Sequence, residues 1–523
     1  MTARDYGLDF LKSAQLCRAE MYGDWYRDPW GWAEILWAKE EPSKLPLDEL
    51  LKKTKDGVEI RNTPEFSPLQ VPKSLLGIRP AVVMSADAHL LYLASIASVA
   101  PKLHANLPEW VHGWRIRGND FIAHNSNEWR QYLNQFSLDG ARGWVLKTDI
   151  TSFFASVNVE NVATLLSTQL GKCAPATVTG SILRAHDTLL SHSGLPQRSY
   201  GSAIIANSLL RPVDDLIVRS LEKGKISKAV RWMDDIYLFG DEGPLFALNL
   251  ELHQRMRQLG LELNASKSDL LPAAELAREF DLEKIEEIET PPIEVDAPSG
   301  VTVAVQLDTS KVLDLEERIL ADPQIWSRHV VRLALRGLKD NYEFDKAGHW
   351  LTVIGKLPHH ADSIGRYLRD AVHFPYSDLS WDRLESWFND FVASPWASIP
   401  WVQAQAALTF DSTLAASSVL KSRLTEWLEK SNDIQLVAIA IQRLGMVDSG
   451  LVRDVVRARI DNVTSPLMLR NFALGLMAVN EERTLVRKIL GRDPRNILLT
   501  SMFESKGYRP LSVIKDFDHA EGD

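Results

Sequence analysis

The spacing of hydrophobic positions changes along the chain and separates two kinds of structure. Residues 143–150 (GWVLKTDI) are a short apolar run that ends in a carboxylate, which predicts a buried strand. Residues 229–240 (AVRWMDDIYLFG) are two apolar half-strands joined at Asp234 and Asp235, which predicts a hairpin. Residues 201–221 have apolar positions at three- and four-residue spacing and predict a helix. This part of the chain therefore predicts mixed α and β structure.

Beyond about residue 310 the pattern is that of amphipathic helices broken at short intervals. Clear examples are residues 325–338, 381–392, 419–430, 434–445 and 451–460. Short polar breaks between successive helices predict antiparallel pairs, as in HEAT-like repeats. Residues 286–300 are acidic, carry three prolines and lack a helical period, so they predict a linker. We therefore expect an α+β protein with four parts: a helical segment (1–74), a mixed domain (75–285), a linker (286–309) and an α-helical repeat domain (310–523).

The N-terminal 60 residues predict helices rich in aromatic side chains. The aromatic residues are Tyr22, Trp25, Tyr26, Trp30, Trp32 and Trp37. One interpretation is that they pack against the body of the protein. The other is a stacking surface for nucleotides, because bases stack on any aromatic face.

Composition excludes several classes of protein. An apolar fraction of 45% and a charged fraction of 24% are typical of a globular chain. Two cysteines exclude a disulfide framework and a cysteine-based zinc site. No apolar run reaches the roughly 18 residues of a membrane span, so we expect a cytoplasmic protein that does not contact a membrane. The net charge of −10 argues against an extensive duplex footprint but allows a short basic channel.

Three aspartates carry the chemical argument. Asp149 ends one predicted strand, and Asp234 and Asp235 lie at the predicted hairpin between apolar neighbours. Burying these charges costs free energy unless a cation compensates them. Two Mg²⁺ ions about 3.5–4 Å apart can activate an attacking hydroxyl and stabilise leaving pyrophosphate, and Mg²⁺ prefers such oxygen ligands. The pattern favours nucleotidyl transfer over the more common solvated turn.

These segments resemble the palm of reverse transcriptases. KTDITSFF (147–154) resembles the first palm motif, and GLPQRSYGSAIIAN (194–207) resembles the second. RWMDDIYLF (231–239) resembles the third, with Trp232 where tyrosine is usual, and LGLELNASKS (259–268) resembles the fourth. Residues 79–117 resemble the fingers of bacterial members. Four motifs in the right order across roughly residues 75–275 predict a fingers–palm domain.

The resemblance implies roles for individual residues. Asp149, Asp234 and the backbone of Ile150 would bind two Mg²⁺ ions (Mn²⁺ is the alternative), supported by Asp235. The amides of Ile150, Thr151, Ser152 and Phe153 would hold the triphosphate. Phe154 would lie under the sugar and exclude a 2′-hydroxyl, which predicts deoxynucleotide substrates.

The resemblance also implies roles for several polar and basic residues. Lys267 would protonate pyrophosphate, and the alternative is an ordinary surface lysine. Gln197 would contact nucleotide or template, and Arg115 and Arg117 are candidate triphosphate clamps.

One departure from the reverse-transcriptase motifs indicates a particular subgroup of that family. Arg198 stands where the second motif has glycine, so a long cation would obstruct a template or bind a phosphate. No thumb is evident after the fourth motif. A palm followed by a helical array resembles the abortive-infection polymerases of bacterial phage defence. That group implies template-independent DNA synthesis, a protein primer, a single-stranded DNA product attached to the protein, and a homo-oligomer. Candidate priming residues are Tyr6, Tyr22 and Tyr26.

Two other interpretations stay open. The chain could be a templated reverse transcriptase that works with a noncoding RNA, or a catalytically silent scaffold or sensor. The helical region is expected to be a structural or oligomerisation platform. Its alternative is a groove for the emerging strand, with a set of cations as candidate contacts: Lys421, Arg423, Arg453, Arg457 and Arg459.

Overall fold

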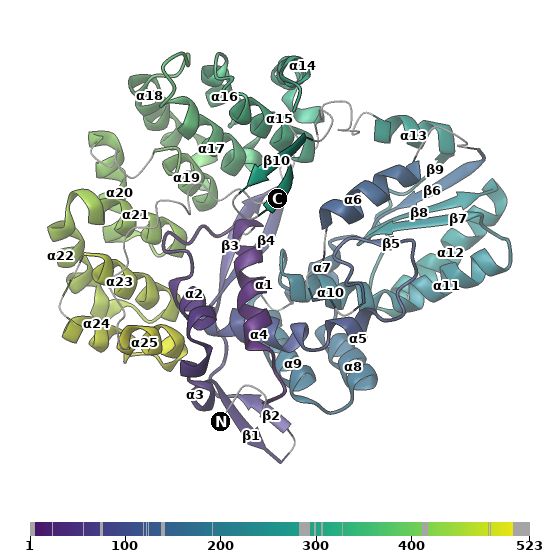
Figure 1. Cartoon of the computed structure of the whole chain (residues 1–523), viewed down its shortest axis with the longest axis horizontal. Coiled ribbons are helices and arrows are strands. Elements are labelled where there is room, and N and C mark those ends of the chain that lie inside the picture. The colour runs from purple at the N-terminus through teal and green to yellow at the C-terminus, as the bar shows by residue number, and fades with distance from the viewer. Residues whose placement is uncertain are drawn as a thin grey trace.

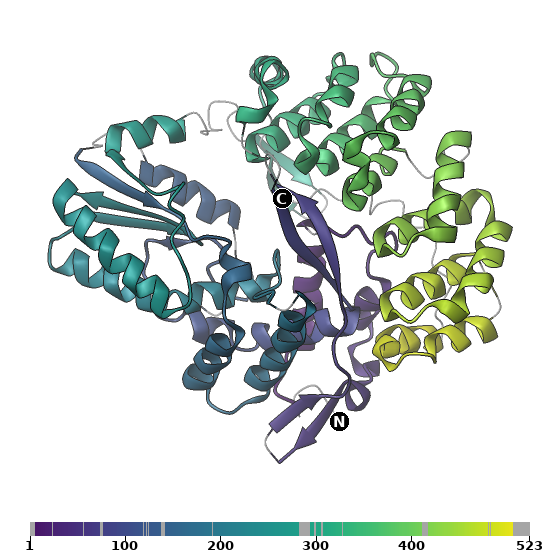
Figure 2. The same ribbon diagram turned by 180° about the vertical axis from the view of Figure 1, so that it is seen from behind.

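The computed structural model describes residues 6–505, apart from residues 24, 56, 74–76, 119, 122, 124, 137–141, 191, 282–292, 298–299, 305–306, 327, 411–416, 480 and 482. Its first half contains a mixed five-stranded sheet and its second half is largely helical (Figure 1). The predicted α+β class is confirmed at this level. In both views the sheet and the helical array lie on opposite sides of a central N-terminal layer (Figures 1 and 2).

The sheet has the strand order β5-β7-β8-β6-β9, with β5 parallel to β7 and the other pairs antiparallel. Its strands are β5 (Val111–His112), β6 (Trp144–Thr148), β7 (Lys228–Trp232), β8 (Asp235–Gly240) and β9 (Asp269–Pro272). Side chains alternate between its faces, so Val145 and the next residue, Leu146, belong to different hydrophobic clusters. The predicted strand and hairpin are therefore both confirmed.

Helices cover both faces of this sheet (Figure 1). On one face lie α11 (Arg211–Glu222) and α12 (Glu242–Gln258), and on the other lie α6 (Asn125–Leu133) and α13 (Ala273–Asp281). The remaining helices of this half continue into the N-terminal layer. They are α7 (Phe153–Ser156), α8 (Val159–Leu170), α9 (Ala174–Asp187) and α10 (Tyr200–Leu209). Covered on both faces, the sheet is rigid enough to hold side chains at its end in fixed positions.

The N-terminal layer contains both helices and hairpins. It consists of α1 (Phe10–Gly23), α2 (Ala33–Glu40), α3 (Leu47–Leu50), β1 (Leu51–Thr54), β2 (Gly57–Ile60), β3 (Phe66–Pro72), β4 (Ile78–Met84), α4 (Ala86–Ala97) and α5 (Ala100–His104). The β1–β2 hairpin replaces the last of the predicted helices. The side chains of Trp25, Tyr26, Trp30, Trp32 and Trp37 are buried. This confirms packing for these five aromatics; the side chain of Tyr22 lies outside the described set.

One expected element is wrong. Within the predicted linker, β10 (Ile293–Ala297) and β11 (Gly300–Ala304) pair antiparallel, with Ile293 opposite Ala304. The pattern IEVDA alternates apolar and acidic residues, which is the period of a strand. The acidic content and the prolines concealed this alternation.

The C-terminal region is a curved array of short helices (Figures 1 and 2). Its helices are α14 (Thr309–Ala321), α15 (Arg328–Asp340), α16 (Ala347–Val353), α17 (Ala361–Ala371), α18 (Trp381–Val392), α19 (Pro400–Ala407), α20 (Ser418–Lys430), α21 (Ile434–Val447), α22 (Ser449–Arg459), α23 (Pro466–Ala478), α24 (Arg483–Leu490) and α25 (Ile497–Glu504). Within the described ranges, no helix is both long and apolar enough to cross a membrane.

The N-terminal layer packs directly on this array. The indole nitrogen of Trp401 donates to the carbonyl of Trp25 at 2.9 Å, and the amide of Gln442 donates to the carbonyl of Pro29 at 3.1 Å. The first and last parts of the chain therefore share one core, so the N-terminal segment links the sheet to the array.

Candidate active site

The strand register brings the three predicted aspartates to one end of the sheet. In the β6–β8 ladder, Thr148 pairs with Ile236, so the next residue, Asp149, continues toward Asp235. In the hairpin, Trp232 pairs with Asp235, which leaves Met233 and Asp234 as a two-residue turn. Neighbouring antiparallel strands are about 4.8 Å apart. Two strand ends therefore position the three acids that the sequence selected.

The hairpin turn between β7 and β8 is strained, and hydrogen bonds from Arg231 support it. Met233 has φ +54°, a left-handed conformation that glycine usually supplies at this place in a two-residue turn. The guanidinium of Arg231 donates to the Met233 carbonyl at 2.8 Å and to the Asn207 side-chain oxygen at 3.0 Å. It also forms a two-point ion pair with Asp214, and both side chains are fully buried. Arg231 thus holds the turn that carries Asp234.

Asp149 is buried and has a lysine partner. The ammonium nitrogen of Lys267 lies 2.6 Å from Asp149 Oδ2, and its side chain is half exposed. Asn264 approaches the same oxygen at 3.4 Å, and its backbone amide donates to the Asp149 carbonyl at 2.7 Å. The segment before β9 therefore orients Asp149. Lys267 lies in the site, as the resemblance implies.

The acids repel one another. Burial, followed by the charges of Asp235 and Asp149, raises the pKa of Asp234 to about 7. The Asp149 and Asp234 carboxyls are also close enough to interact by hydrogen bonding. Although burial opposes it, the hydrogen bond to Asp149 raises the pKa of Lys267, which keeps its ammonium protonated. Like charges held this close favour a bound cation.

The donor set suits Mg²⁺ completed by a substrate. Among the described residues, no three His, Cys, Asp or Glu side chains are grouped so that they alone could hold a metal ion. The Ile150–Leu263 bridge is flanked by bonds from Thr151 to Glu262 and from Asn264 to Asp149. In such a pair, the Ile150 carbonyl points to the opposite side, toward β8 and its aspartates. Two carboxylates, a carbonyl, phosphate and water form a normal Mg²⁺ shell.

The predicted triphosphate loop is partly used within the fold. The Thr151 amide donates to the Glu262 carbonyl at 2.9 Å, so this amide is not available as the resemblance implied. Ser152 is exposed and has φ +47°. Phe153 is buried, whereas Phe154 is only partly buried, next to Phe153 with ring centroids 5.6 Å apart. The placement of Phe154 allows a contact with a sugar.

The first and second motifs touch through a glycine. Leu195 donates its amide to the Phe154 carbonyl at 2.8 Å. Gly194 has φ +64°, and a Cβ there would lie 2.2 Å from the Phe154 carbonyl oxygen. No other residue could occupy this position without moving the backbone. The second motif is therefore fixed to the segment that begins at Asp149.

Arg198 has an unexpected environment. Its guanidinium lies 4.8 Å from the centre of the Trp25 ring, and its backbone has φ +61°. The left-handed backbone supplies a second reason why glycine suits this position. Gln197 is partly exposed beside it. The side chain of Arg198 points to the N-terminal layer, which the sequence did not indicate.

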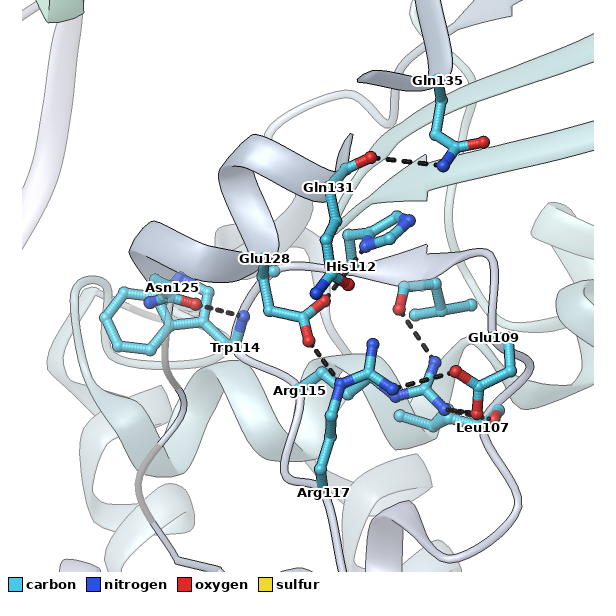
Figure 3. Close-up of polar contacts among 12 residues, drawn as sticks. Leu107, Glu109, His112, Trp114, Arg115, Arg117, Asn125, Glu128, Gln131 and Gln135 are labelled. Carbon is cyan, nitrogen blue, oxygen red and sulfur yellow. Dashed lines mark hydrogen bonds and ion pairs between the residues drawn. The ribbon is translucent and has the colours of Figure 1, made fainter. Parts of the chain in front are cut away.

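Two predicted clamps have structural partners instead. Arg115 is buried; it donates to the carbonyls of Val111 and Leu107 at 3.0 Å and pairs with Glu109 at 2.9 Å. Arg117 pairs with Glu109 at 2.9 Å and with Glu128 at 2.5 Å (Figure 3). Both guanidiniums hold the loop around β5. Burial of Arg115 argues against its role as a clamp, whereas a triphosphate contact of Arg117, which is 41% exposed, stays a prediction.

Sequence analysis missed a cation that does lie near the aspartates. Arg79 on β4 is within electrostatic range of Asp234, and its guanidinium lies 5.8 Å from the centre of the Trp25 ring. A lone arginine in β4 carries no local motif. Arg27, Arg79 and Arg198 lie far apart in the sequence, and only the fold brings them together, so the sequence holds no signal for this cation.

Two of the three candidate priming tyrosines are buried, which argues against them, since a priming hydroxyl has to be accessible. Tyr6 and Tyr26 are each about 2% exposed. The Tyr6 hydroxyl donates to Asp48 at 2.5 Å, and the Tyr26 hydroxyl contacts Asn471 at 3.5 Å. The side chain of Tyr22 lies outside the described residues. By contrast, Tyr200 in the second motif is partly exposed, with its ring 4.5 Å from that of Trp114.

No protein-family model and no curated protein sequence matches the chain. The functional argument therefore depends on the geometry of the site and on the motifs.

Proposed function

We propose that this chain is a nucleotidyltransferase of the reverse-transcriptase type that synthesises DNA. The observation that carries the proposal is the meeting of Asp149 with Asp234 and Asp235 at the end of one sheet, with Lys267 2.6 Å from Asp149. A purely structural ion pair with Lys267 would need only one acid. This site has three acids, and burial together with the neighbouring charges raises the pKa of Asp234. Such an arrangement is typical of functional sites.

The chain's own residues account for each part of the reaction. Two Mg²⁺ ions, when bound, would activate the attacking 3′-oxygen and stabilise the leaving pyrophosphate. Asp149, Asp234 and the Ile150 carbonyl would hold them, and Arg231 keeps the Asp234 turn in place. Lys267 carries a proton that it can donate to pyrophosphate. Phe154 would lie against the sugar and exclude a 2′-hydroxyl.

We further propose that synthesis needs no template and starts on the protein. The supporting observation is that Arg198 lies in the electrostatic field of Asp362 on α17, so the C-terminal array reaches the second motif. A duplex would have to pass the place where the array approaches this motif. The resemblance to abortive-infection polymerases extends the proposal to antiphage defence in bacteria and to a homo-oligomer.

The direct test is incorporation without nucleic acid. Purified protein is incubated with Mg²⁺ and labelled deoxynucleotides, then denatured and separated by size. Label that stays with the protein is the expected result. Asp149→Asn and Asp234→Asn should abolish it, because each keeps the shape of the side chain and removes the charge. Asp241→Asn is the matched control, since Asp241 is an exposed acid at the start of α12.

The outcomes separate the alternatives. Label that appears only with added RNA would favour the templated reverse transcriptase. No label under any condition, with antiphage defence unaffected by Asp234→Asn, would favour the scaffold. Mass spectrometry of labelled protein then locates the primer. Among the tyrosines whose side chains the structure describes, Tyr200, Tyr342 and Tyr376 are not buried, and Tyr200→Phe tests the one nearest the site.

A further inference from the structure

Arginines from two parts of the chain meet on the ring of Trp25. The guanidinium of Arg198 lies 4.8 Å and that of Arg79 5.8 Å from the centre of this ring. Trp25 is itself buried, so it is a fixed support for both cations. Because Arg79 is also within electrostatic range of Asp234, the pair adjoins the aspartates of the candidate active site.

The helical array adds more arginines to the same place. One terminal nitrogen of Arg328, at the start of α15, donates to both carboxylate oxygens of Asp362, at 2.9 and 2.7 Å, and Arg366 lies 3.9 Å from the same carboxylate. Arg332 lies one turn further along α15, also in the field of Asp362. Burial alone would raise the pKa of Asp362, but the surrounding arginines, including Arg27 and Arg198, hold it far below its ordinary value.

We name this group the junction cluster. It comprises Arg27, Arg79, Arg198, Arg328, Arg332 and Arg366. Asp362 is the carboxylate they surround, with Asp234 acting on Arg79. All six arginines are partly exposed, so an external ligand can reach them. Six guanidinium groups are thus gathered at this junction, although the chain as a whole carries a net charge of −10.

Polar atoms without partners lie beside the junction cluster. His360 is fully buried, and neither of its ring nitrogens has a hydrogen-bond partner among the described residues. The Nε of Arg328 and the Nδ1 of the neighbouring His359 are in the same situation. Burial, followed by neighbouring Arg328 and Arg79, lowers the pKa of His359 to about 4. Guanidinium groups gathered in this way form a site that an anion would stabilise.

The size of the cluster selects the anion. Guanidinium groups match phosphate in geometry, and the arginines of the junction cluster come from the N-terminal segment, β4, the second motif, α15 and α17. A strand carries its phosphates in a row. We propose that the junction cluster binds the phosphodiester backbone of a single DNA strand next to its growing end. This inference rests on the proposed function for the identity of the strand, and it makes the helical array part of the binding site.

Binding is measured in protein that cannot synthesise DNA. The full chain with Asp234→Asn is titrated onto a fluorescent oligo(dT) of about 15 nucleotides, with fluorescence anisotropy recorded over a range of salt concentrations. The double variant Arg332→Gln/Arg366→Gln should bind roughly tenfold more weakly at low salt. Its slope of log affinity against log salt should fall by about 1.4, because each phosphate contact contributes about 0.7 on single strands.

The matched control is Arg336→Gln on the same helix. Arg336 is 58% exposed and lies 3.5 Å from Asp340, so its replacement should leave affinity and slope unchanged. Arg198→Gly is a second test with little risk to folding, because glycine suits the φ of +61° at this position. It should weaken binding as well.

Two results would overturn the proposal. One is a double variant and an Arg198→Gly variant that both bind oligo(dT) as tightly as the control. The other is complete displacement of the oligonucleotide by deoxynucleoside triphosphate or pyrophosphate, which would assign the cluster to the triphosphate. The proposed function can fail independently: a chain that binds the strand through these arginines but never incorporates label would refute synthesis and leave this inference intact.

Discussion

At the scale of single residues, backbone strain occurs in three of the sequence motifs. Of the six described non-glycine residues with positive φ, three lie in the segments that resemble the first three palm motifs, one in each: Ser152, Arg198 and Met233. Each such residue costs of order 1–3 kcal/mol, and strain of this kind gathers at functional sites. The motifs were visible in the sequence, but the strain was not, since only glycine announces a left-handed backbone.

Replacing Arg198 measures this strain. Arg198→Gly removes the backbone penalty of ~1 kcal/mol and the cation–π contact with Trp25, worth about 0.5–1 kcal/mol, so its free energy of unfolding should stay close to that of the parent. Arg198→Ala loses the contact and keeps the strain, so it should be less stable than Arg198→Gly by ~1 kcal/mol. Urea denaturation measures both. Equal stabilities of the two variants would show that the position is not strained.

Glu128 links stability to pH. Burial would raise its pKa, but hydrogen bonds from His112 and Arg117 lower it to about 2. The folded pKa lies below the ordinary value of 4.5, so the stabilisation is present above pH 4.5 and is lost as pH falls toward 2. Glu128→Gln should cost about 1.5–3 kcal/mol at pH 7 and progressively less in acid. Thermal melting between pH 7 and pH 3 tests this.

The control for Glu128 is Glu109, which also contacts Arg117 but is 82% exposed. Glu109→Gln should change stability by less than about 1 kcal/mol at any pH. A Glu128→Gln penalty that is the same at pH 7 and pH 3 would contradict the assigned ion pairs. The sequence showed the charges of Arg115 and Arg117 but not their ion-pair partners. The pairing with Glu109 and Glu128 depends on how the loop around β5 folds.

At the scale of elements, the period of the pattern predicted the strands that matter. β6, β7 and β8 have apolar runs that end at or flank the aspartates, and the register follows once they pair. The β10–β11 hairpin was missed because its acidic alternation resembled a linker. Arg231 was missed for another reason: it lies inside a strand, where its ion pair with Asp214 of α11 depends on packing between elements.

Arg231→Lys tests whether this packing positions the hairpin. Lysine keeps the charge but cannot donate to Asp214, Asn207 and the Met233 carbonyl together. Misplacing the turn by about 1 Å can cost 10²-fold in rate. We expect kcat for nucleotide incorporation to fall about 10–100-fold, KM for the nucleotide to change little, and the Mg²⁺ concentration for half-maximal rate to rise.

The control is Arg257→Lys on α12, where the guanidinium is 72% exposed and 3.7 Å from Glu262. It should leave all three kinetic quantities unchanged. A variant at Arg231 that only melts earlier, with normal kcat and Mg²⁺ dependence below its melting temperature, would limit this residue to a structural role.

At the scale of the whole molecule, distant parts of the sequence make one site. The aromatic content of the N-terminal segment predicted packing, but its partner is the C-terminal array, hundreds of residues away. The cations on this array that were the alternative candidates for contacts with an emerging strand have local partners: Lys421 pairs with Asp448, Arg423 with Glu426 and Arg457 with Glu481. The array's members of the junction cluster, Arg328, Arg332 and Arg366, lie on α15 and α17, which carry no recognisable sequence motif.

Buried ion pairs join the N-terminal segment to the C-terminal array. Arg470 on α23 is buried and pairs with Asp28 at 2.8 Å and with Glu34, while its guanidinium lies 4.4 Å from the centre of the Trp32 ring. Arg470→Met leaves two buried carboxylates without their cation, so it should cost about 3–5 kcal/mol. Arg487→Met, at a half-exposed pair with Glu504, should cost far less, because exposed ion pairs contribute little to stability. Because residues 25–34 also carry Trp25 and Arg27, release of this segment should weaken oligo(dT) binding in Arg470→Met at temperatures where the sheet is still folded. Chemical denaturation and anisotropy measure the two effects, and unchanged binding in a clearly destabilised Arg470→Met protein would separate the N-terminal segment from the strand site.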